Sequence, residues 1–264
     1  MTATKGMPMP DLLVDRSDGV VTVTLNRPAR KNGVTWPLIE ELNRELEEIA
    51  RRPEDRVVVL TGAGGSFCSG MDLAESVGRE EFIFMRRVGR VVTLLHEMPK
   101  PTLAKVAGAA VGFGCNLALA CDLVVAGESA VLGEIFADRG LTLDGGGSWS
   151  LPRLVGLAKA KELVFFARRL SGTEAARIGL VNRVLPDEEL DEGVREWARR
   201  LADGPTVALS MMKKSLNASF EASFAQAVEA EATAQALSFR APEAREGMRA
   251  FMERRPPRFR PAES

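Results

Sequence analysis

The stretch KPTLAKVAGAAVGFGCNLALACDL, residues 100–123, decides the fold class, because two kinds of secondary structure meet within it. Residues 101–108 predict a strand, and residues 112–121 have the small side chains and apolar spacing of a helix. A second strand is predicted at 122–127. Strand, helix and strand in succession are typical of a crossover connection, so the stretch predicts an α/β or mixed fold.

The same alternation continues upstream. Valine and threonine alternate with the period of a strand at 20–26, and a short buried strand ending in glycine is predicted at 56–62. Between them, an apolar stripe opposite acids and arginines predicts an amphipathic helix at 36–52. A further helix is predicted at about 80–97.

Downstream of Arg139 the chain becomes more helical. A helix is predicted at 157–169, a capping box opens another at Ser171, and a short strand follows at 179–186. Almost all of 189–254 has helical periodicity. We therefore expect a core over residues 1–200 and a helical region over residues 201–264, which packs on the core or on a neighbouring subunit.

The composition narrows the range of functions. The chain has 264 residues, is 45% hydrophobic and 27% charged, and carries a net charge of -1. No overall basic field favours nucleic acid, no apolar run approaches the length of a membrane span, and no secretory h-region follows the first methionine. Three cysteines without metal-type spacing fit a reducing compartment, so we expect a cytoplasmic protein with no nucleic-acid or membrane partner.

Two residue types are nearly or wholly missing, and this disfavours several chemistries. The chain has one histidine, His96, and no tyrosine. A Ser-His-Asp or Cys-His catalyst would depend on His96, which lies at the end of a predicted helix where a structural role is typical. A zinc site needs several clustered ligands, so we expect no metal.

Glycines gather at two strand ends, in 60–73 and in 107–122. Neither stretch satisfies the dinucleotide or P-loop pattern. Taken singly, each is typical of an ordinary strand-to-helix turn. Taken together, they place two loops with free backbone N–H groups in one chain, and such groups can converge on one oxygen as an oxyanion hole.

The chain resembles the crotonase, or enoyl-CoA hydratase/isomerase, superfamily over nearly its whole length. The matching stretches are LNRPARKN (25–32), GGSFCSGMDL (64–73), KPTLAKVAGAAVGFGCNLALACDL (100–123), GL…GGGSW…LPRLVG (140–156), LSGTEAARIGLVNRVLP (170–186) and FMERRPPRF (251–259). The resemblance implies a spiral of repeated ββα units, with a C-terminal helical region that forms homotrimers or dimers of trimers. It also implies an acyl-CoA thioester substrate whose coenzyme A is the only cofactor-like group.

Carried over by motif position, the oxyanion-hole donors are the backbone N–H groups of Met71 and Phe113. Coenzyme A is expected at a basic loop and at a C-terminal aromatic residue, although plain solvated charge explains the basic residues equally well. The complete set of substrate-binding residues that the resemblance implies is Arg27, Arg30, Lys31, Ser69, Gly70, Asp72, Leu73, Gly112, Gly114, Asn116, Phe136 and Phe251.

The sequence departs from the family's hydratases at both of their glutamates. Asn116 occupies the first position and Phe136, four residues before Gly140, occupies the second. Glu134 is close but out of register. Asp144, four residues after Gly140, stands where several isomerases of the superfamily carry a catalytic aspartate.

These departures favour a reaction with a single base. One carboxylate can move a proton from the α to the γ carbon of a 3-enoyl thioester, whereas water addition makes a harder demand that two carboxylates meet well. Asn116 can orient a water molecule but cannot act as a base. We therefore expect an enoyl-CoA isomerase that uses Asp144, with an enoyl-CoA hydratase as the nearest alternative and a catalytically silent acyl-CoA-binding protein as the alternative from another class.

Overall fold

Six strands form the main sheet of the protein. The structure is a computed structural model that describes residues 9–72, 74 and 80–260. The strands are β1 (Leu12–Ser17), β2 (Val20–Leu25), β3 (Val57–Gly62), β4 (Thr102–Val106), β6 (Leu123–Gly127) and β9 (Arg183–Leu185), and they lie side by side in the order β1-β2-β3-β4-β6-β9. β1 and β2 form an antiparallel hairpin. The neighbouring pairs β2-β3, β3-β4, β4-β6 and β6-β9 of this sheet are parallel.

A second, three-stranded sheet is built from β5 (Ala109–Val111), β7 (Val131–Gly133) and β8 (Arg169–Ser171). The chain passes from β4 to β5 and then into α4 (Phe113–Leu119). The chain then passes from the main sheet to the second sheet again, from β6 to β7, and continues into α5 (Gly147–Val155) and α6 (Leu157–Phe165). This alternation between the sheets, closed each time by helix, is the expected repeat of ββα units.

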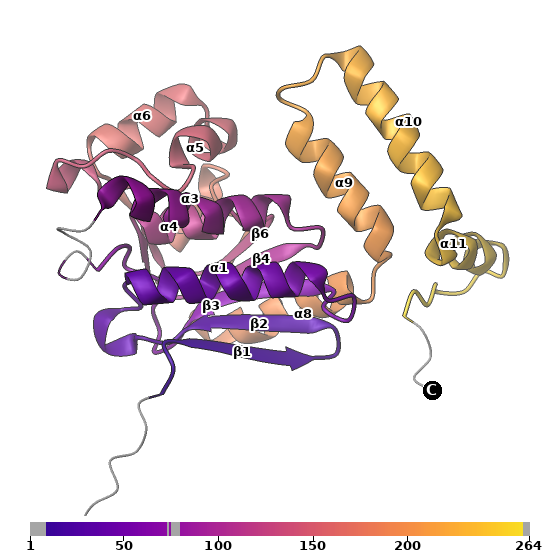
Figure 1. The fold of residues 1–264 in the computed structure, drawn as a ribbon, viewed down its shortest axis with the longest axis horizontal. Helices are drawn as coiled ribbons and strands as arrows, with labels where there is room; N and C mark the ends of the chain where they lie inside the picture. Colours follow the sequence, from indigo (N-terminus) through magenta and orange to yellow (C-terminus); the bar gives the residue numbers. More distant parts are fainter. Residues whose placement is uncertain (1–8, 73, 75–79, 261–264) are drawn as a thin grey trace, which may run out of the picture.

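The two faces of the main sheet are covered by different helices. Val58 and Leu60 of β3 belong to the hydrophobic cluster that includes α1 (Trp36–Arg51) and α3 (Glu81–Glu97). Val57 and Val59 belong to a second cluster with α8 (Leu190–Ala202). Side chains alternate along a strand, so this near-continuous run of valine and leucine places apolar groups on both faces. Figure 1 shows α1 and α8 on opposite sides of the strands.

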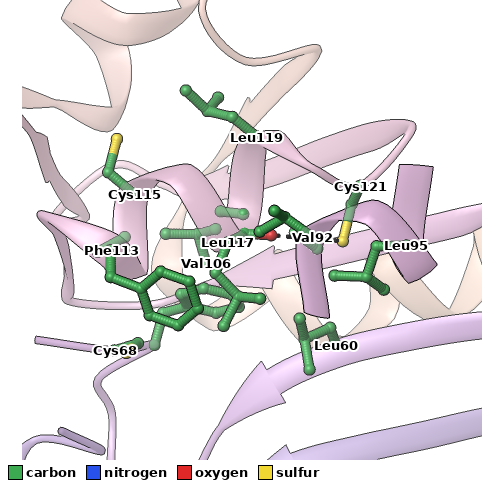
Figure 2. Packing of buried hydrophobic residues seen from close by; sticks show 14 of the residues in the cluster. Leu60, Cys68, Val92, Leu95, Val106, Phe113, Cys115, Leu117, Leu119 and Cys121 are labelled. Atoms are coloured by element: carbon green, nitrogen blue, oxygen red, sulfur yellow. Dashed lines mark hydrogen bonds between the residues drawn. The ribbon is translucent and has the colours of Figure 1, made fainter. Parts of the chain in front are cut away.

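α4 lies at the centre of the larger cluster, and all its residues are buried. Figure 2 shows Phe113 and Leu117 near Cys68 and Val106, whereas Cys115 and Leu119 project from the other side of the helix. The three cysteines are free and buried. The start of α4 is therefore held in a tightly packed environment.

The C-terminal helices α9 (Thr206–Ala218), α10 (Phe224–Arg240) and α11 (Pro242–Met252) extend away from the sheets (Figure 1). Many large apolar side chains in these helices and in the turn between α9 and α10 are exposed: Met212, Leu216, Phe220, Phe224, Val228, Leu237, Phe239, Met248, Phe251 and Met252. The expected division at residue 200 falls inside α8. Within the described ranges, no helix is long and apolar enough to cross a membrane.

Candidate active site

A cavity of about 360 Å³ opens where the two glycine-rich loops meet. Its lining residues are Arg30, Gly33, Ser69, Gly70, Met71, Asp72, Gly112, Phe113, Ile135, Phe136, Arg139, Leu141 and Asp144. The loops are joined through Cys68: its N–H donates to the carbonyl of Ala109 at 2.8 Å, and its carbonyl accepts from Val111 N–H at 3.1 Å. The loops that are far apart in sequence thus form one wall.

Glycines allow this close approach. A Cβ on Gly70, which has φ +91°, would lie 3.0 Å from the carbonyl oxygen of Val111 and 3.6 Å from the nitrogen of Phe113. A Cβ on Gly114 would lie only 2.2 Å from the carbonyl oxygen of Cys68. A side chain at either position would push the loops apart, so both glycines are required by the packing.

Met71 and Phe113 both line the cavity, and the backbone N–H of each has no hydrogen-bond partner among the described residues. Phe113 is the first residue of α4, where an N–H has no intrahelical acceptor. The preceding Gly112, with φ +56°, donates to the carbonyl of Gly133 at 2.8 Å. Two such donors can stabilise an oxygen that gains negative charge.

Asp144 supplies a carboxyl group to the same cavity. Its Oδ1 is buried and has no hydrogen-bond partner in the described structure. Burial raises the pKa of Asp144 to about 7. The cavity's other acid, Asp72, is already held by Arg27 at 3.2 Å. Asp144 is therefore placed to exchange a proton near neutral pH.

The three glycines after Asp144 fit the backbone against α4. Gly145 and Gly146 have φ +52° and +78°. A Cβ on Gly145 would lie 3.0 Å from Cβ of Asn116, and one on Gly147 would lie 2.5 Å from its Oδ1. The glycine run thus brings the main chain that carries Asp144 directly over Asn116.

Asn116 lies behind the cavity and does not line it, which differs from the expectation that it contacts substrate. It is 1% exposed. Its Nδ2 donates to Oε2 of Glu134 at 3.1 Å and to the main-chain carbonyl of Asp144 at 3.0 Å. Phe136, in contrast, does line the cavity and is buried, as a wall that excludes water.

Glu134, which counting along the sequence left out of register with the family's glutamates, lies against Asn116. It is 2% exposed and contacts Asn116 from the end of β7. Burial raises its pKa to about 7; the Cys115 and Asn116 hydrogen bonds lower it, and the nearby Asp144 raises it. The signal for it was an acid inside the apolar segment AVLGEIF, because a buried carboxyl needs a partner.

The basic residues of the first loop have different surroundings. Arg27 donates to the carbonyl of Gly33 and pairs with Asp72 and with Asp11, at 3.2 Å and 3.3 Å respectively, so it ties the loop together. Arg30 lines the cavity. Lys31 is exposed beside it, and its carbonyl accepts from Ser69 N–H.

The remaining expected residues lie apart from the cavity or outside the description. Phe251 is 84% exposed on α11 and is not among the residues that line the cavity. Leu73 lies outside the described residues. His96 packs edge-on against Trp149, with ring centroids 5.1 Å apart. In the part of the chain that the structure describes, no three His, Cys, Asp or Glu residues are grouped to hold a metal ion.

The fold and these loops define a class of protein. The profile of the Enoyl-CoA hydratase/isomerase family matches residues 15–262, and the chain belongs to that family, whose members act on acyl-CoA thioesters. The neighbouring solved structures have the crotonase fold. One of them, the enoyl-CoA hydratase of Bacillus anthracis, has a TM-score of 0.91 and 34% identity over 95% of this chain and 99% of that one.

Two relatives carry different activities in their names. The chain is 37% identical over 246 residues to a "Probable enoyl-CoA hydratase" of Rhodobacter capsulatus, covering 92% of this chain and 95% of the relative. It is 36% identical over 248 residues to the 1,2-epoxyphenylacetyl-CoA isomerase of Escherichia coli, covering 91% and 95%. Family membership therefore defines the enzyme class and leaves the reaction to the residues of the site.

Proposed function

We propose that this protein is an enoyl-CoA isomerase that moves the double bond of a 3-enoyl-CoA to the 2 position, with Asp144 as the single base. The observation that carries the proposal is that Asp144 shares one cavity with the unpartnered N–H groups of Met71 and Phe113. The cavity's other carboxylate, Asp72, is paired with Arg27.

The reaction needs one proton to move between two carbons. Asp144 removes a proton from the α carbon, and the electron pair of that C–H bond moves toward the thioester carbonyl, whose oxygen becomes an enolate. The two N–H groups stabilise this oxygen, a contribution that is worth about 100-fold or more per donor in comparable sites. Asp144 then returns the proton to the γ carbon, so the new double bond lies between the α and β carbons and no atom is gained.

A second candidate is an enoyl-CoA hydratase, and the names of the relatives favour it. Hydration needs an activated water and a proton donor at the β and α carbons. The second buried carboxyl, Glu134, is 2% exposed and is not among the residues that line the cavity. In hydration, Asp144 would therefore have to activate the water and also serve as the proton donor. Isomerisation needs one base only, and this supports it as the first choice.

The test compares a 3-enoyl-CoA with a 2-enoyl-CoA, using the wild type and Asp144→Asn, and follows products by mass and absorbance. We expect the 3-enoyl ester to isomerise without gaining the mass of water, and the variant to be slower by about 100-fold or more. Fast hydration of the 2-enoyl ester would establish the hydratase. Tight binding of both esters without turnover would establish the silent binding protein.

Coenzyme A is proposed to bind at the mouth of the cavity beside Arg30 and Lys31. Both residues are exposed there, which leaves their charges accessible to the phosphates. Arg27 is assigned a structural role, since its guanidinium is held by Asp72 and Asp11. No separate cofactor is needed for the proton transfer. The cytoplasmic location stays a prediction.

The protein is proposed to form homotrimers or dimers of trimers through α9, α10 and α11. The support is the exposed apolar side chains of these helices, among them Phe224 and Phe251, which are 86% and 84% exposed. Analytical ultracentrifugation should give a trimer or hexamer for the wild type, and Phe224→Asp should dissociate it. A monomeric wild type would contradict the assembly.

A further inference from the structure

The buried side chains of Glu134 and Asn116 form a connected group with the main chain of Asp144. The amide of Asn116 lies between the others: its Nδ2 donates to Glu134 Oε2 at 3.1 Å and to the Asp144 carbonyl at 3.0 Å. Glu134 also follows Gly133, whose carbonyl accepts the N–H of Gly112, immediately before the donor Phe113. Glu134 is therefore joined to both parts of the proposed active site.

The group holds more acceptors than donors. Three of its oxygens, Asn116 Oδ1, Glu134 Oε1 and Asp144 Oδ1, are buried without a partner in the described structure. Nδ2 of Asn116 already serves two acceptors. A buried acceptor without a donor costs about 1–3 kcal/mol. A proton on Glu134 would add a donor to this group, whereas an ionised Glu134 would leave the deficit unchanged.

The surroundings of Glu134 disfavour its charge. Burial and the nearby Asp144 on the glycine loop raise its pKa, whereas the hydrogen bonds from Cys115 on α4 and from Asn116 lower it, and neither titratable neighbour is a cation. Cys115 is buried, and burial, followed by the nearby Glu134, raises its pKa. The pKa of Cys68, which joins the two glycine-rich loops, is likewise raised by burial and, to a smaller extent, by Asp144. Among the described residues, Glu134 has no ion-pair partner.

We propose that Glu134 is a positioning residue that acts in its protonated form, holding Asn116 and, through it, the main chain of Asp144. The proposal rests on the function assigned to Asp144 above. A neutral Glu134 keeps a second negative charge away from Asp144, so that Asp144 can be the carboxyl group that ionises. It contacts no substrate and has no chemical step of its own.

The test uses two substitutions that distinguish a hydrogen-bonding role of the protonated Glu134 side chain from a role in packing alone. Glu134→Gln keeps an acceptor for Asn116 and adds a permanent donor, so it mimics the protonated acid. Glu134→Ala removes both. We expect Glu134→Gln to keep kcat within about twofold, and Glu134→Ala to lower kcat about tenfold to 100-fold with little change in KM, because a small misplacement of a reacting group is costly.

Glu128 provides the matched control. It also follows a glycine at the end of a strand, β6, but its side chain is exposed. Glu128→Gln and Glu128→Ala should leave kcat, KM and the pH profile unchanged. All variants are compared per folded molecule, with circular dichroism and an unfolding curve recorded for each.

Two kinetic outcomes overturn the proposal. If Glu134→Ala has wild-type kcat, Glu134 positions nothing. If Glu134→Gln is as slow as Glu134→Ala, the protonated form is not the active one. Asp144→Asn, measured in parallel with whichever enoyl ester the wild type converts, separates the two levels: full activity in that variant refutes Asp144 as the base, whatever Glu134 does.

A readout without turnover completes the test. Carbon-13 spectra of the glutamate-labelled wild type identify the Glu134 carboxyl by its loss in Glu134→Gln. We expect a protonated carboxyl at about pH 6, well above the ordinary glutamate pKa of about 4.3. An ionised Glu134 at that pH overturns the proposal even if no ester is converted.

Discussion

A Cβ atom on Gly147 would lie 2.5 Å from Oδ1 of Asn116 and 2.6 Å from its Nδ2. The backbone after Asp144 is therefore in direct contact with the amide that holds Asp144's own carbonyl. This contact explains the glycines at 145 and 147, because a side chain at either position would press against Asn116.

Gly147→Ala should consequently damage both stability and activity. The added methyl must push Asn116 or the loop aside, which we expect to cost about 1–3 kcal/mol in the free energy of unfolding, as overpacking does. Turnover should fall at least tenfold as Asp144 moves. Chemical denaturation and steady-state kinetics measure the two effects.

Gly89→Ala is the control for that substitution. Gly89 lies in α3, and a Cβ there would meet nothing within 4 Å. Alanine should stabilise the helix by about 0.5–1 kcal/mol and leave turnover unchanged. If Gly147→Ala behaved like Gly89→Ala, the contact with Asn116 would contribute neither to stability nor to turnover.

The pH dependence of turnover should report Asp144. Burial raises its pKa to about 7, and only its ionised form accepts a proton. The value of kcat/KM should therefore rise as the pH increases through about 7 and then level off. A profile already flat from about pH 5 upward would contradict a base with this pKa.

Stability should change in the opposite direction with pH. Glu134 and Asp144 have folded-state pKa values raised to about 7, above their unfolded values of about 4. Between these limits the folded protein binds more protons than the unfolded chain, so the free energy of unfolding falls as the pH rises from about 4 to about 7. Urea denaturation across this range should show a flatter dependence in Glu134→Gln and in Asp144→Asn; an unchanged slope in both would refute the assignment.

Two neighbouring arginines should have separable roles. Arg27→Ala removes the cation that faces Asp72 and Asp11, and we expect it to cost about 1–3 kcal/mol of stability. Arg30→Ala should leave stability unchanged and raise KM for CoA esters about fivefold, as loss of one exposed charge contact does. Thermal unfolding and kinetics distinguish the two; the reverse pattern would mean that Arg27 is the CoA contact.

The elements that the sequence predicted are those with a clear period. Residues 36–52 and 122–127 were predicted as helix and strand and form α1 and β6 with small shifts at the ends. β7 and β8 were not predicted, because three residues carry no period and their pairing is fixed by neighbours distant in the chain. α5 was also missed, since it follows three glycines and contains Pro152.

The same division holds for the site. The family resemblance named Met71, Phe113 and Asp144, and all three residues line one cavity, whereas their roles stay a prediction. Counting residues from Gly140 did not reveal that Glu134 reaches Asn116, because that contact depends on how β7 ends against α4. A count along the chain locates backbone positions, whereas a contact between side chains needs the packing of both elements.

Phe113 belongs both to the hydrophobic core and to the lining of the cavity. The residue is 1% exposed in the core, yet its main-chain N–H has no partner among the described residues. A separate segment contributes Ile135, Phe136 and Leu141 to the lining of the same cavity. Substitutions in that segment can therefore change the shape of the cavity while the position of the Phe113 N–H stays fixed by the packing of the core.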